Sequence, residues 1–287
     1  MIPKTIHYCW FGGNPLPELA QKCIASWKKY CPDYEIIEWN ESNFDFSECD
    51  YAREAYEAKK WAFVSDYARF KILYEYGGVY FDTDVEVIKP IDEIIKNGAY
   101  MGCETDGKYS VTKDLTSNRI ASKMNTHITV APGLGIAVNP GLGLYKEILD
   151  FYNNIHFKRE DGSLNLNTVV KYTTDILVKH GLKDIKGIQK IEGITIYPTE
   201  YFCPKNLETG TVAITDNTLT IHHFDGSWLS EEEKYFNYLK LKFNRFLPKK
   251  LAHWLSVIVG FTKYRGLLKM PIEVVRYKLR NIKNRSF

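Results

Sequence analysis

Two aspartates separated by one residue, Asp82 and Asp84, are the residues of this chain best suited to bind a metal ion. They follow the short apolar run VYF at 79–81, which predicts a strand. Because side chains alternate along an extended chain, we expect both carboxylates on the same side. Two like charges so placed repel each other unless a cation lies beside them, and hard dications prefer oxygen ligands. The spacing predicts a metal site for a phosphorylated substrate, and the alternative is a solvated pair that caps a turn.

A second pair of charged residues, Asp66 and Arg69, precedes the aspartates. They lie three positions apart in a stretch with helical periodicity, which Gly77-Gly78 is expected to end, so both belong to one helical face. One interpretation is an ion pair within the helix. The other is contact with a substrate, because the rigid fork of arginine binds a diphosphate or vicinal hydroxyls through two bonds.

The whole arrangement over residues 65–84, S-D-x-x-R followed by G-G-x-Y-x-D-x-D, resembles the DXD sugar transferases of glycosyltransferase family 32. Glucosylating domains of large clostridial toxins and Golgi mannosyl- and galactosyltransferases carry similar signatures. The resemblance spans about residues 1–230. It implies a GT-A-like α/β fold, with a Rossmann-type, mostly parallel sheet flanked by helices. It also implies a retaining hexosyltransferase that uses Mn²⁺ or Mg²⁺ and a nucleotide-diphospho-sugar.

The resemblance also implies roles for single residues. Asp84 would bind the metal directly, while Asp82 would contact the ribose or reach the metal through water. Asp66 would hold donor-sugar hydroxyls and Arg69 would reach the sugar or phosphate, so we place these two with Asp82 in the catalytic set. The spacing itself adds Tyr80: it lies two positions before the first aspartate and is therefore expected on the same side of the strand, which makes it a candidate for contact with the donor.

The start of the chain, IHYCWFGG, is similar to the I-H-x-x-W-x-G-G start of the same family. There the tryptophan stacks on the nucleotide base, a use of its flat apolar face that costs little entropy. Trp10 is therefore a candidate for base stacking, and a buried core tryptophan is the alternative.

The late segment IHHFDGSW resembles the H-x-x-x-G-S-W segment of the family, in which one histidine completes the metal shell. Neighbouring residues of a strand face opposite sides, so only one of His222 and His223 can be the ligand. We favour His222, with Asp225 as the second choice. Ser227 and Trp228 are candidates for a lid over the diphosphate, and a plain surface turn is the alternative.

The elements expected around these residues alternate between strands and helices. A β-α-β-α-β order implies a mostly parallel sheet with ligands at the carboxyl ends of its strands. The segments 101–104 and 131–140 are candidates for an acceptor pocket, and the polar stretch 105–125 predicts a mobile loop. The expected strands are 5–10, 34–39, 79–81, 85–88, 100–104, 129–138, 193–197, 211–215 and 218–224. The expected helices are 18–30, 51–76 (as one helix or two), 141–154, 167–180 and three short ones after 231, separated by prolines.

Charge divides the chain unequally. Residues 240–287 hold 13 Lys/Arg and one acid, a balance of +12, so the other 239 residues carry 25 basic and 34 acidic side chains, a balance of −9. We expect a catalytic domain over 1–230 and a basic helical extension over 231–287. Basic helices with interleaved aromatics suit an anionic membrane surface, with a helical extension packed on the acidic body as the alternative. Nucleic acid is not expected as a partner, because no recognition motif accompanies the charge.

These observations favour one function over two rivals. The expected enzyme transfers a sugar from a UDP-linked donor to a saccharide or lipid-linked acceptor, as in capsule or surface polysaccharide synthesis. With no signal peptide or spanning segment in the sequence, we expect it in the cytoplasm, peripheral to the inner membrane face. A phosphatase of the haloacid dehalogenase type also uses D-x-D, but Glu86 stands where that pattern has Thr or Val. The other rival is an inactive nucleotide-sugar-binding membrane adaptor.

Overall fold

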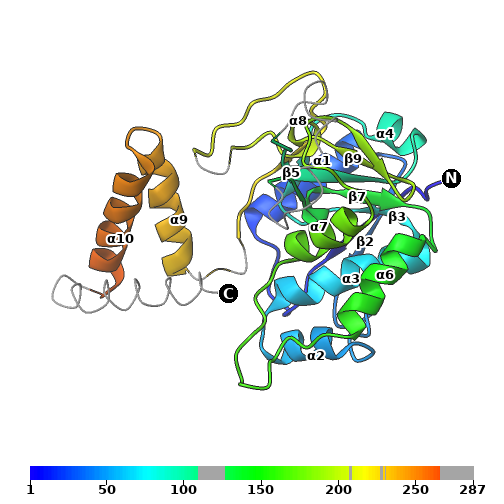
Figure 1. Ribbon diagram of the computed structural model, residues 1–287, viewed down its shortest axis with the longest axis horizontal. Helices are drawn as coiled ribbons and strands as arrows, with labels where there is room; N and C mark the ends of the chain where they lie inside the picture. Colours follow the sequence, from blue (N-terminus) through cyan, green and yellow to red (C-terminus); the bar gives the residue numbers. More distant parts are fainter. Residues whose placement is uncertain (109–126, 207–208, 227–228, 230, 266–287) are drawn as a thin grey trace. The chain divides into compact units, whose positions relative to one another are not determined.

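A central β-sheet forms the core of the computed structural model, which describes residues 1–108, 127–206, 209–226, 229 and 231–265 (Figure 1). The strand order is β2-β1-β3-β7-β5-β9-β8, and β6 pairs with β5 beside this path. From the pairings, β2, β1, β3, β5 and β9 run in one direction, and β6, β7 and β8 run in the other. The strands are β1 Thr5–Cys9, β2 Glu35–Trp39, β3 Gly78–Tyr80, β5 Tyr100–Thr105, β6 Thr129–Val130, β7 Ile136–Val138, β8 Gln189–Ile191 and β9 Ile194–Tyr197.

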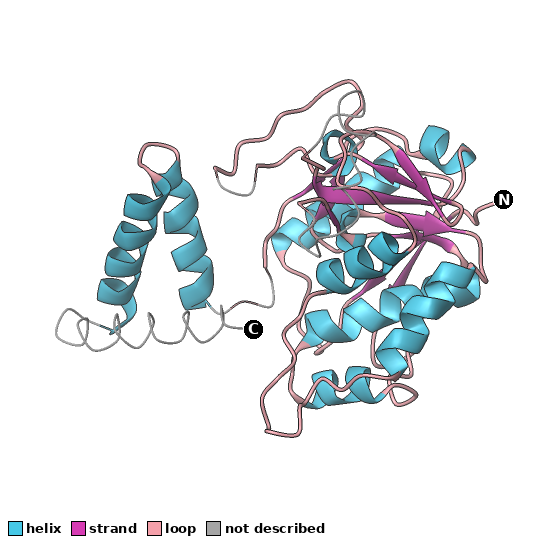
Figure 2. Ribbon diagram, in the orientation of Figure 1, coloured by secondary structure: helices cyan, strands magenta, loops and turns pink. Residues whose placement is uncertain are grey.

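Helices cover both faces of this sheet, and strand alternation supplies each face with its own core (Figure 2). In β3, for example, Val79 packs with α1 on one face, and Tyr80 packs with α3 on the other. This confirms the predicted α/β fold with a mostly parallel sheet flanked by helices. The helices of this part of the chain are α1 Glu18–Tyr30, α2 Asp50–Glu57, α3 Trp61–Tyr76, α4 Asp92–Lys96, α6 Gly143–Asn153, α7 Val169–Lys179 and α8 Thr199–Phe202, with a 3-10 turn, η1, over Pro132–Leu134.

Helix α3 ends where the sequence indicates, at the glycine pair. Gly77 has φ +65°, and a Cβ there would lie 2.6 Å from Pro140 Cδ. Gly78 has φ +97°, and a Cβ there would lie 2.7 Å from the Thr5 carbonyl oxygen. Only glycine meets both demands, so the chain turns abruptly from α3 into β3.

A small second sheet pairs β4, Val85–Val87, with β10, Thr220–His222, in antiparallel fashion. Its register places His222 opposite Val85, directly after the D-T-D segment. This pairing joins two parts of the chain that are far apart in sequence.

Several predicted elements differ from the structure. The strand expected over 129–138 is two strands, β6 and β7, because the turn η1 and Gly135 at φ +126° interrupt it. The strand expected over 211–215 is absent from this described segment, where Val212 makes only an isolated bridge to Lys205. Most of the loop expected over 105–125, and the helix expected after Pro271, lie outside the described residues.

The chain divides into two compact units. The first comprises Met1–Pro204 and Ala213–Phe224, and the second comprises Lys205–Val212 and Asp225–Phe287. In the second unit, α9, Glu231–Asn244, packs against α10, Lys249–Arg265. No helix within the described ranges is long and apolar enough to cross a membrane.

Candidate metal centre

The D-T-D segment lies in a turn and not on the extended strand that the sequence analysis expects. Strand β3 ends at Tyr80, and the Val85 amide donates a hydrogen bond to the Asp82 carbonyl (3.0 Å). The strand alternation invoked for the two carboxylates is therefore wrong. The two carboxylates nevertheless lie close together, with one oxygen of each within 4.8 Å of the other.

Asp82, Asp84 and His222 form a compact group of potential metal ligands. One ligand atom from each lies within 4.8 Å of the others, and all three residues are partly buried. The His222 Nε2 atom is 3.0 Å from Asp84 Oδ1. These are the three residues that the sequence analysis names as metal ligands, and their role as ligands stays a prediction.

The two neighbouring histidines face different partners, as expected for successive residues at a strand end. His222 turns toward Asp84, whereas His223 Nε2 lies 2.8 Å from Glu86 Oε2. Glu86 in turn pairs with Lys22 at 3.0 Å. His223 therefore belongs to a separate ion-pair group, which makes it a natural control for His222.

Arg69 connects helix α3 to the D-T-D turn. Its Nη2 atom lies 3.1 Å from Asp82 Oδ1 and 3.2 Å from Asp66 Oδ1, and its side chain is 4% exposed. The guanidinium also lies over the Tyr80 ring, 5.1 Å from its centroid. The expected ion pair between Asp66 and Arg69 is thus present and buried, and the same guanidinium also pairs with Asp82 of the D-T-D turn.

The charges of this group shift one another's pKa values. Burial raises the pKa of the Asp66 carboxyl to about 7, although Arg69 acts in the opposite direction. Burial likewise raises the pKa of Asp82, again against the effect of Arg69. The carboxylates in turn raise the pKa of Arg69 despite its burial. The cluster thus holds more acidic than basic groups in a poorly solvated place, an arrangement that favours an added cation.

The environment of His222 fits a metal ligand. Its Nδ1 atom is buried and has no hydrogen-bond partner among the residues that the structure describes. Burial opposes the charged imidazole, yet the nearby Asp84, Asp82 and Glu104 raise its pKa. Two carboxylate oxygens with one imidazole nitrogen suit a divalent ion such as Mn²⁺. Glu104 belongs to the segment 101–104, which is expected to line an acceptor pocket. The sequence did not indicate that Glu104 lies close enough to His222 to raise its pKa.

Gly133, in η1, is a residue of this site that the sequence reasoning did not single out. A Cβ at this position would lie 2.1 Å from Asp82 Oδ2, and the Gly133 carbonyl accepts a hydrogen bond from the Asp82 amide (3.3 Å). The only sign in the sequence is a glycine after Pro132, which equally indicates an ordinary turn. The structure shows that this glycine leaves room for the Asp82 carboxylate.

The other predicted donor-site residues differ in accessibility. Trp10 follows β1 and is partly exposed, so it is not a fully buried core residue, and its Nε1 donates to the Asn14 carbonyl (2.5 Å). Tyr80 is 1% exposed, and its ring packs against the Arg69 guanidinium. Ser227 and Trp228 lie outside the described residues. The contacts of all four with a donor stay predictions.

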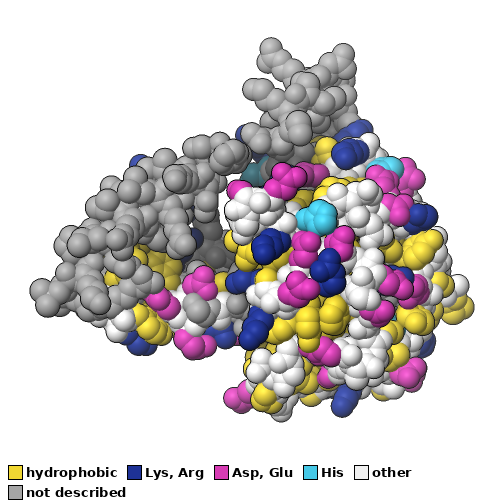
Figure 3. Space-filling model, turned by 90° about the horizontal axis from the view of Figure 1, so that it is seen from below, with side chains coloured by type: hydrophobic (Ala, Val, Ile, Leu, Met, Phe, Trp, Pro, Cys, Tyr) yellow, Lys and Arg dark blue, Asp and Glu magenta, His cyan; other side chains and the backbone are white. Residues whose placement is uncertain are grey.

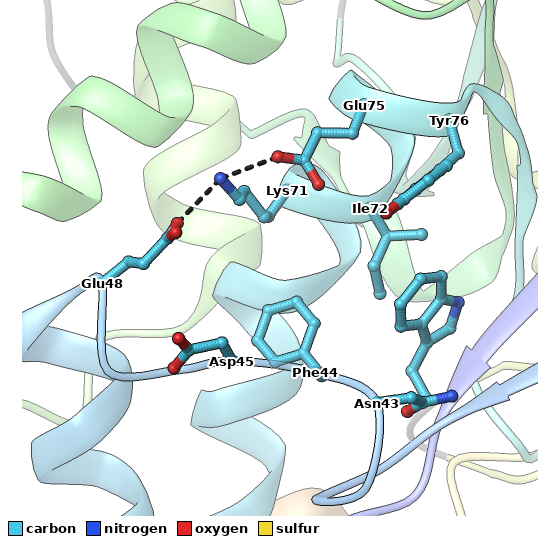
Figure 4. Close-up of a pocket in the computed structure, with 9 residues that line it drawn as sticks. Asn43, Phe44, Asp45, Glu48, Lys71, Ile72, Glu75 and Tyr76 are labelled. Atoms are coloured by element: carbon cyan, nitrogen blue, oxygen red, sulfur yellow. Dashed lines mark ion pairs between the residues drawn. The ribbon is translucent and has the colours of Figure 1, made fainter.

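A separate hollow of about 210 Å³ lies beside α3 (Figure 4). Its Lys71 ammonium pairs with Glu48 at 2.9 Å and with Glu75 at 2.8 Å. None of the predicted donor-site residues is among the residues that line it, which are Trp39, Asn43, Phe44, Asp45, Glu48, Lys71, Ile72, Glu75 and Tyr76. The metal cluster and this hollow are thus different places on the molecule.

Comparison with known proteins gives a family match for part of the chain. Residues 17–100 match the family described as "Glycosyltransferase sugar-binding region containing DXD motif". Inositol phosphoceramide mannosyltransferase 3 of Schizosaccharomyces pombe is 33% identical over 104 residues, 35% of this chain and 29% of that protein. Inositol phosphoceramide mannosyltransferase 1 of the same organism is 29% identical over 111 residues, 35% of this chain and 33% of that protein. The matches thus span about a third of these curated relatives.

Solved structures with a similar arrangement also include glycosyltransferases. The structure titled "PaToxG Glycosyltransferase" has a TM-score of 0.42 at 19% identity, over 62% of this chain and 69% of that one. A glycosyltransferase involved in glycosylation of the major capsid of PBCV-1 has a TM-score of 0.39 at 12% identity, over 80% of this chain and 96% of that one.

Proposed function

We propose that this protein is a metal-dependent, retaining glycosyltransferase that transfers a sugar from a UDP-linked donor to a saccharide or lipid-linked acceptor. The observation that carries the proposal is the group of Asp82, Asp84 and His222 beside the buried Asp66–Arg69 pair. The match of residues 17–100 to a DXD sugar-binding region supports it, because that match includes four of these five residues.

In this proposal Asp84 and His222 bind Mn²⁺ or Mg²⁺ directly, and Asp82 binds it directly or through water. The metal, when bound, neutralises the charge of the diphosphate leaving group. Arg69 fixes the orientation of Asp82 through their 3.1 Å ion pair. Asp66, at the buried end of the same network, accepts hydrogen bonds from donor-sugar hydroxyls. Trp10 stacks on the base from the carboxyl end of β1, and Ser227 and Trp228 close over the diphosphate.

The acceptor and the location belong to the same proposal. We place the enzyme in the cytoplasm at the inner membrane face, where it would build capsule or other surface polysaccharide. The basic segment 240–287 supports this location, because anionic lipid surfaces attract juxtaposed Lys and Arg side chains.

The adjacent histidines allow a test with a matched control. Purified protein would be assayed with a panel of nucleotide sugars, with and without Mn²⁺, for release of UDP and for transfer. We expect His222→Gln to lower Mn²⁺-dependent turnover about 100-fold, because it changes a metal ligand. His223→Gln, which changes the pair with Glu86, should stay within about threefold of the wild type.

The outcomes separate this function from its rivals. Metal-dependent hydrolysis of phosphomonoesters without nucleotide-sugar turnover would indicate a phosphatase. Calorimetric binding of UDP-sugar without turnover of any donor would indicate an inactive binding protein. Equal losses in the two histidine variants would contradict the metal assignment.

A further inference from the structure

The second unit contains a helical hairpin with a distinct tip and base. Helices α9 and α10 run antiparallel and are joined by a short turn at residues 245–248 (Figure 1). At the base the Tyr264 hydroxyl donates to the Glu231 carbonyl (3.3 Å), and midway the Phe236 and His253 rings are 6.0 Å apart. The turn therefore forms one end of a hairpin whose helices hold each other along their length.

Large apolar side chains are exposed at the tip and along one face of α10. Phe246, in the turn, is 82% exposed, and Leu251, in the first turn of α10, is 47% exposed. Trp254 and Ile258 continue the same face at helical spacing and are less exposed, at 41% and 36%. Exposed aliphatic and aromatic side chains gathered in one place indicate an interaction surface.

Charge is distributed unequally along the hairpin. From 235 to 262 the sequence has no acidic residue, and its five basic residues lie in the turn or in the halves of α9 and α10 nearest to it: Lys240, Lys242, Arg245, Lys249 and Lys250. Within the described part of the hairpin the base carries three acids and three bases, Glu231, Glu232, Glu233, Lys234, Lys263 and Arg265, while the sequence that follows, 266–287, has six Lys/Arg and one acid and lies outside the described residues. The face of the larger unit shown in Figure 3 also mixes both signs. Among the residues of α9, α10 and their turn, the positive charge is therefore concentrated at the exposed apolar tip.

We propose that the hairpin docks tip first on an anionic lipid bilayer, with Phe246 and Leu251 in the headgroup interface and the surrounding cations on acidic headgroups. A lipid interface satisfies both features at once, because it offers apolar depth beneath a negatively charged surface. This inference does not depend on the proposed transferase activity.

The balanced base favours tip-first docking over a hairpin lying flat. A helix that lies in the interface presents one continuous apolar face bordered by basic residues along its length. In α10 the opposite face is already used, since Ala252 and Ser256 are fully buried. The glutamates at the start of α9 would be repelled by an anionic surface if the whole hairpin lay on it.

Vesicle flotation with the full-length protein tests the tip directly. We expect binding to vesicles of equal parts phosphatidylglycerol and phosphatidylcholine at low salt, and little binding to phosphatidylcholine alone. Phe246→Ser and the double variant Lys249→Glu/Lys250→Glu should each weaken binding roughly tenfold or more. Matched controls in the first unit, Ile214→Ser (59% exposed) and Lys28→Glu/Lys29→Glu, should bind like the wild type.

A fluorescent label tests the orientation. All six native cysteines are buried, so an environment-sensitive fluorophore can be directed to Phe246→Cys or, midway along α9, to Asn237→Cys. We expect a blue shift on vesicle addition only at 246. Equal shifts at both positions would overturn tip-first docking. Failure of the wild type to bind anionic vesicles, or full binding by Phe246→Ser, would overturn the proposal itself.

Discussion

One guanidinium holds the candidate site together at the level of single residues. Arg69 is buried and pairs with both Asp66 and Asp82. Removing one partner of such a buried pair leaves an uncompensated charge, which typically costs about 3–5 kcal/mol of stability. A loss of activity in an Arg69 variant would therefore not distinguish a folding defect from a catalytic one. Trp10 and Asp66 are better probes. Trp10 is partly exposed, and in Asp66→Asn the side chain keeps its shape while Arg69 keeps its pair with Asp82 at 3.1 Å.

We expect Trp10→Ala and Asp66→Asn to affect different parts of donor recognition. Trp10→Ala should weaken binding of free UDP about tenfold, because base stacking is lost. Asp66→Asn should leave UDP affinity nearly unchanged and lower turnover of the UDP-sugar about 100-fold, because contacts to the sugar are lost. Calorimetry with UDP and Mn²⁺, and initial rates with the UDP-sugar, measure the two effects.

The two measurements also discriminate between the alternatives for Asp66. If Asp66→Asn weakens UDP and UDP-sugar binding equally, the Asp66–Arg69 pair is only structural. Thermal unfolding of each variant is the control, since both should remain folded.

Gly133→Ala tests the close approach of η1 to the D-T-D turn. The new Cβ would overlap the Asp82 carboxylate, so we expect turnover and Mn²⁺ affinity each to fall at least tenfold. Gly143→Ala is the matched control, because it stands in the first turn of α6 and, outside its own helix and chain neighbours, no atom of the described residues lies within 4 Å of its Cβ position. Equal activity of the two variants would show that Asp82 moves aside freely.

At the level of elements, His7 links β1 to β2 and to the end of α3. Its ring is 1% exposed, its Nε2–H donates to the Gly77 carbonyl (3.0 Å), and its Nδ1 accepts from Trp39 Nε1 (3.1 Å). Both ring nitrogens therefore have a hydrogen-bond partner when the imidazole is neutral. Protonation of Nδ1 would turn it into a donor that faces the Trp39 Nε1–H, which is also a donor. Burial accordingly lowers the pKa of His7 to about 4.

This pKa predicts a specific loss of stability in mild acid. The pKa of His7 is 6.5 in the unfolded chain and about 4 in the folded one, so the unfolded chain binds this proton more readily. The contribution of the neutral His7 to the free energy of unfolding is therefore complete above pH 6.5 and decreases as the pH falls toward 4. Between pH 7 and 5 the loss is about 2 kcal/mol. In urea unfolding, His7→Gln should reduce this pH dependence by that amount. An unchanged dependence would contradict a neutral, buried His7.

Elements with strong local patterns are predictable from the sequence, and elements created by distant pairing are not. The periodic helix 18–30 agrees with α1 at both ends, and the glycine pair correctly ends α3. The D-T-D turn is fixed by the pairing of β4 with β10 more than 130 positions later, which no local pattern shows. Alternation indicates that only one of His222 and His223 can be a ligand, and His222 is favoured because it holds the first position of the H-x-x-x-G-S-W motif. Gly133, in contrast, depends on a tertiary contact that no such motif shows.

At the level of the whole molecule, the second unit is discontinuous in sequence. Residues 205–212 belong to it, although the chain on both sides belongs to the first unit. The Arg245 Nε donates to the Thr209 carbonyl (2.8 Å), and Gly210 lies beside Leu241. The hairpin thus supports a segment that returns to the first unit, and the described ligand cluster lies entirely in that first unit.

Deleting residues 231–287 should therefore separate membrane binding from the chemistry. We expect the shortened protein to stay folded and to hydrolyse the soluble donor at a rate within about threefold of the full chain, because Asp82, Asp84 and His222 remain. It should lose binding to anionic vesicles, and trypsin should cleave after Lys205 roughly tenfold faster, because the segment 205–212 loses its support. Limited proteolysis, vesicle flotation and donor assays on the same preparation measure all three effects. Unfolding of the shortened protein would show instead that the hairpin is a structural part of the catalytic unit, and retained vesicle binding would place the lipid contact in the first unit.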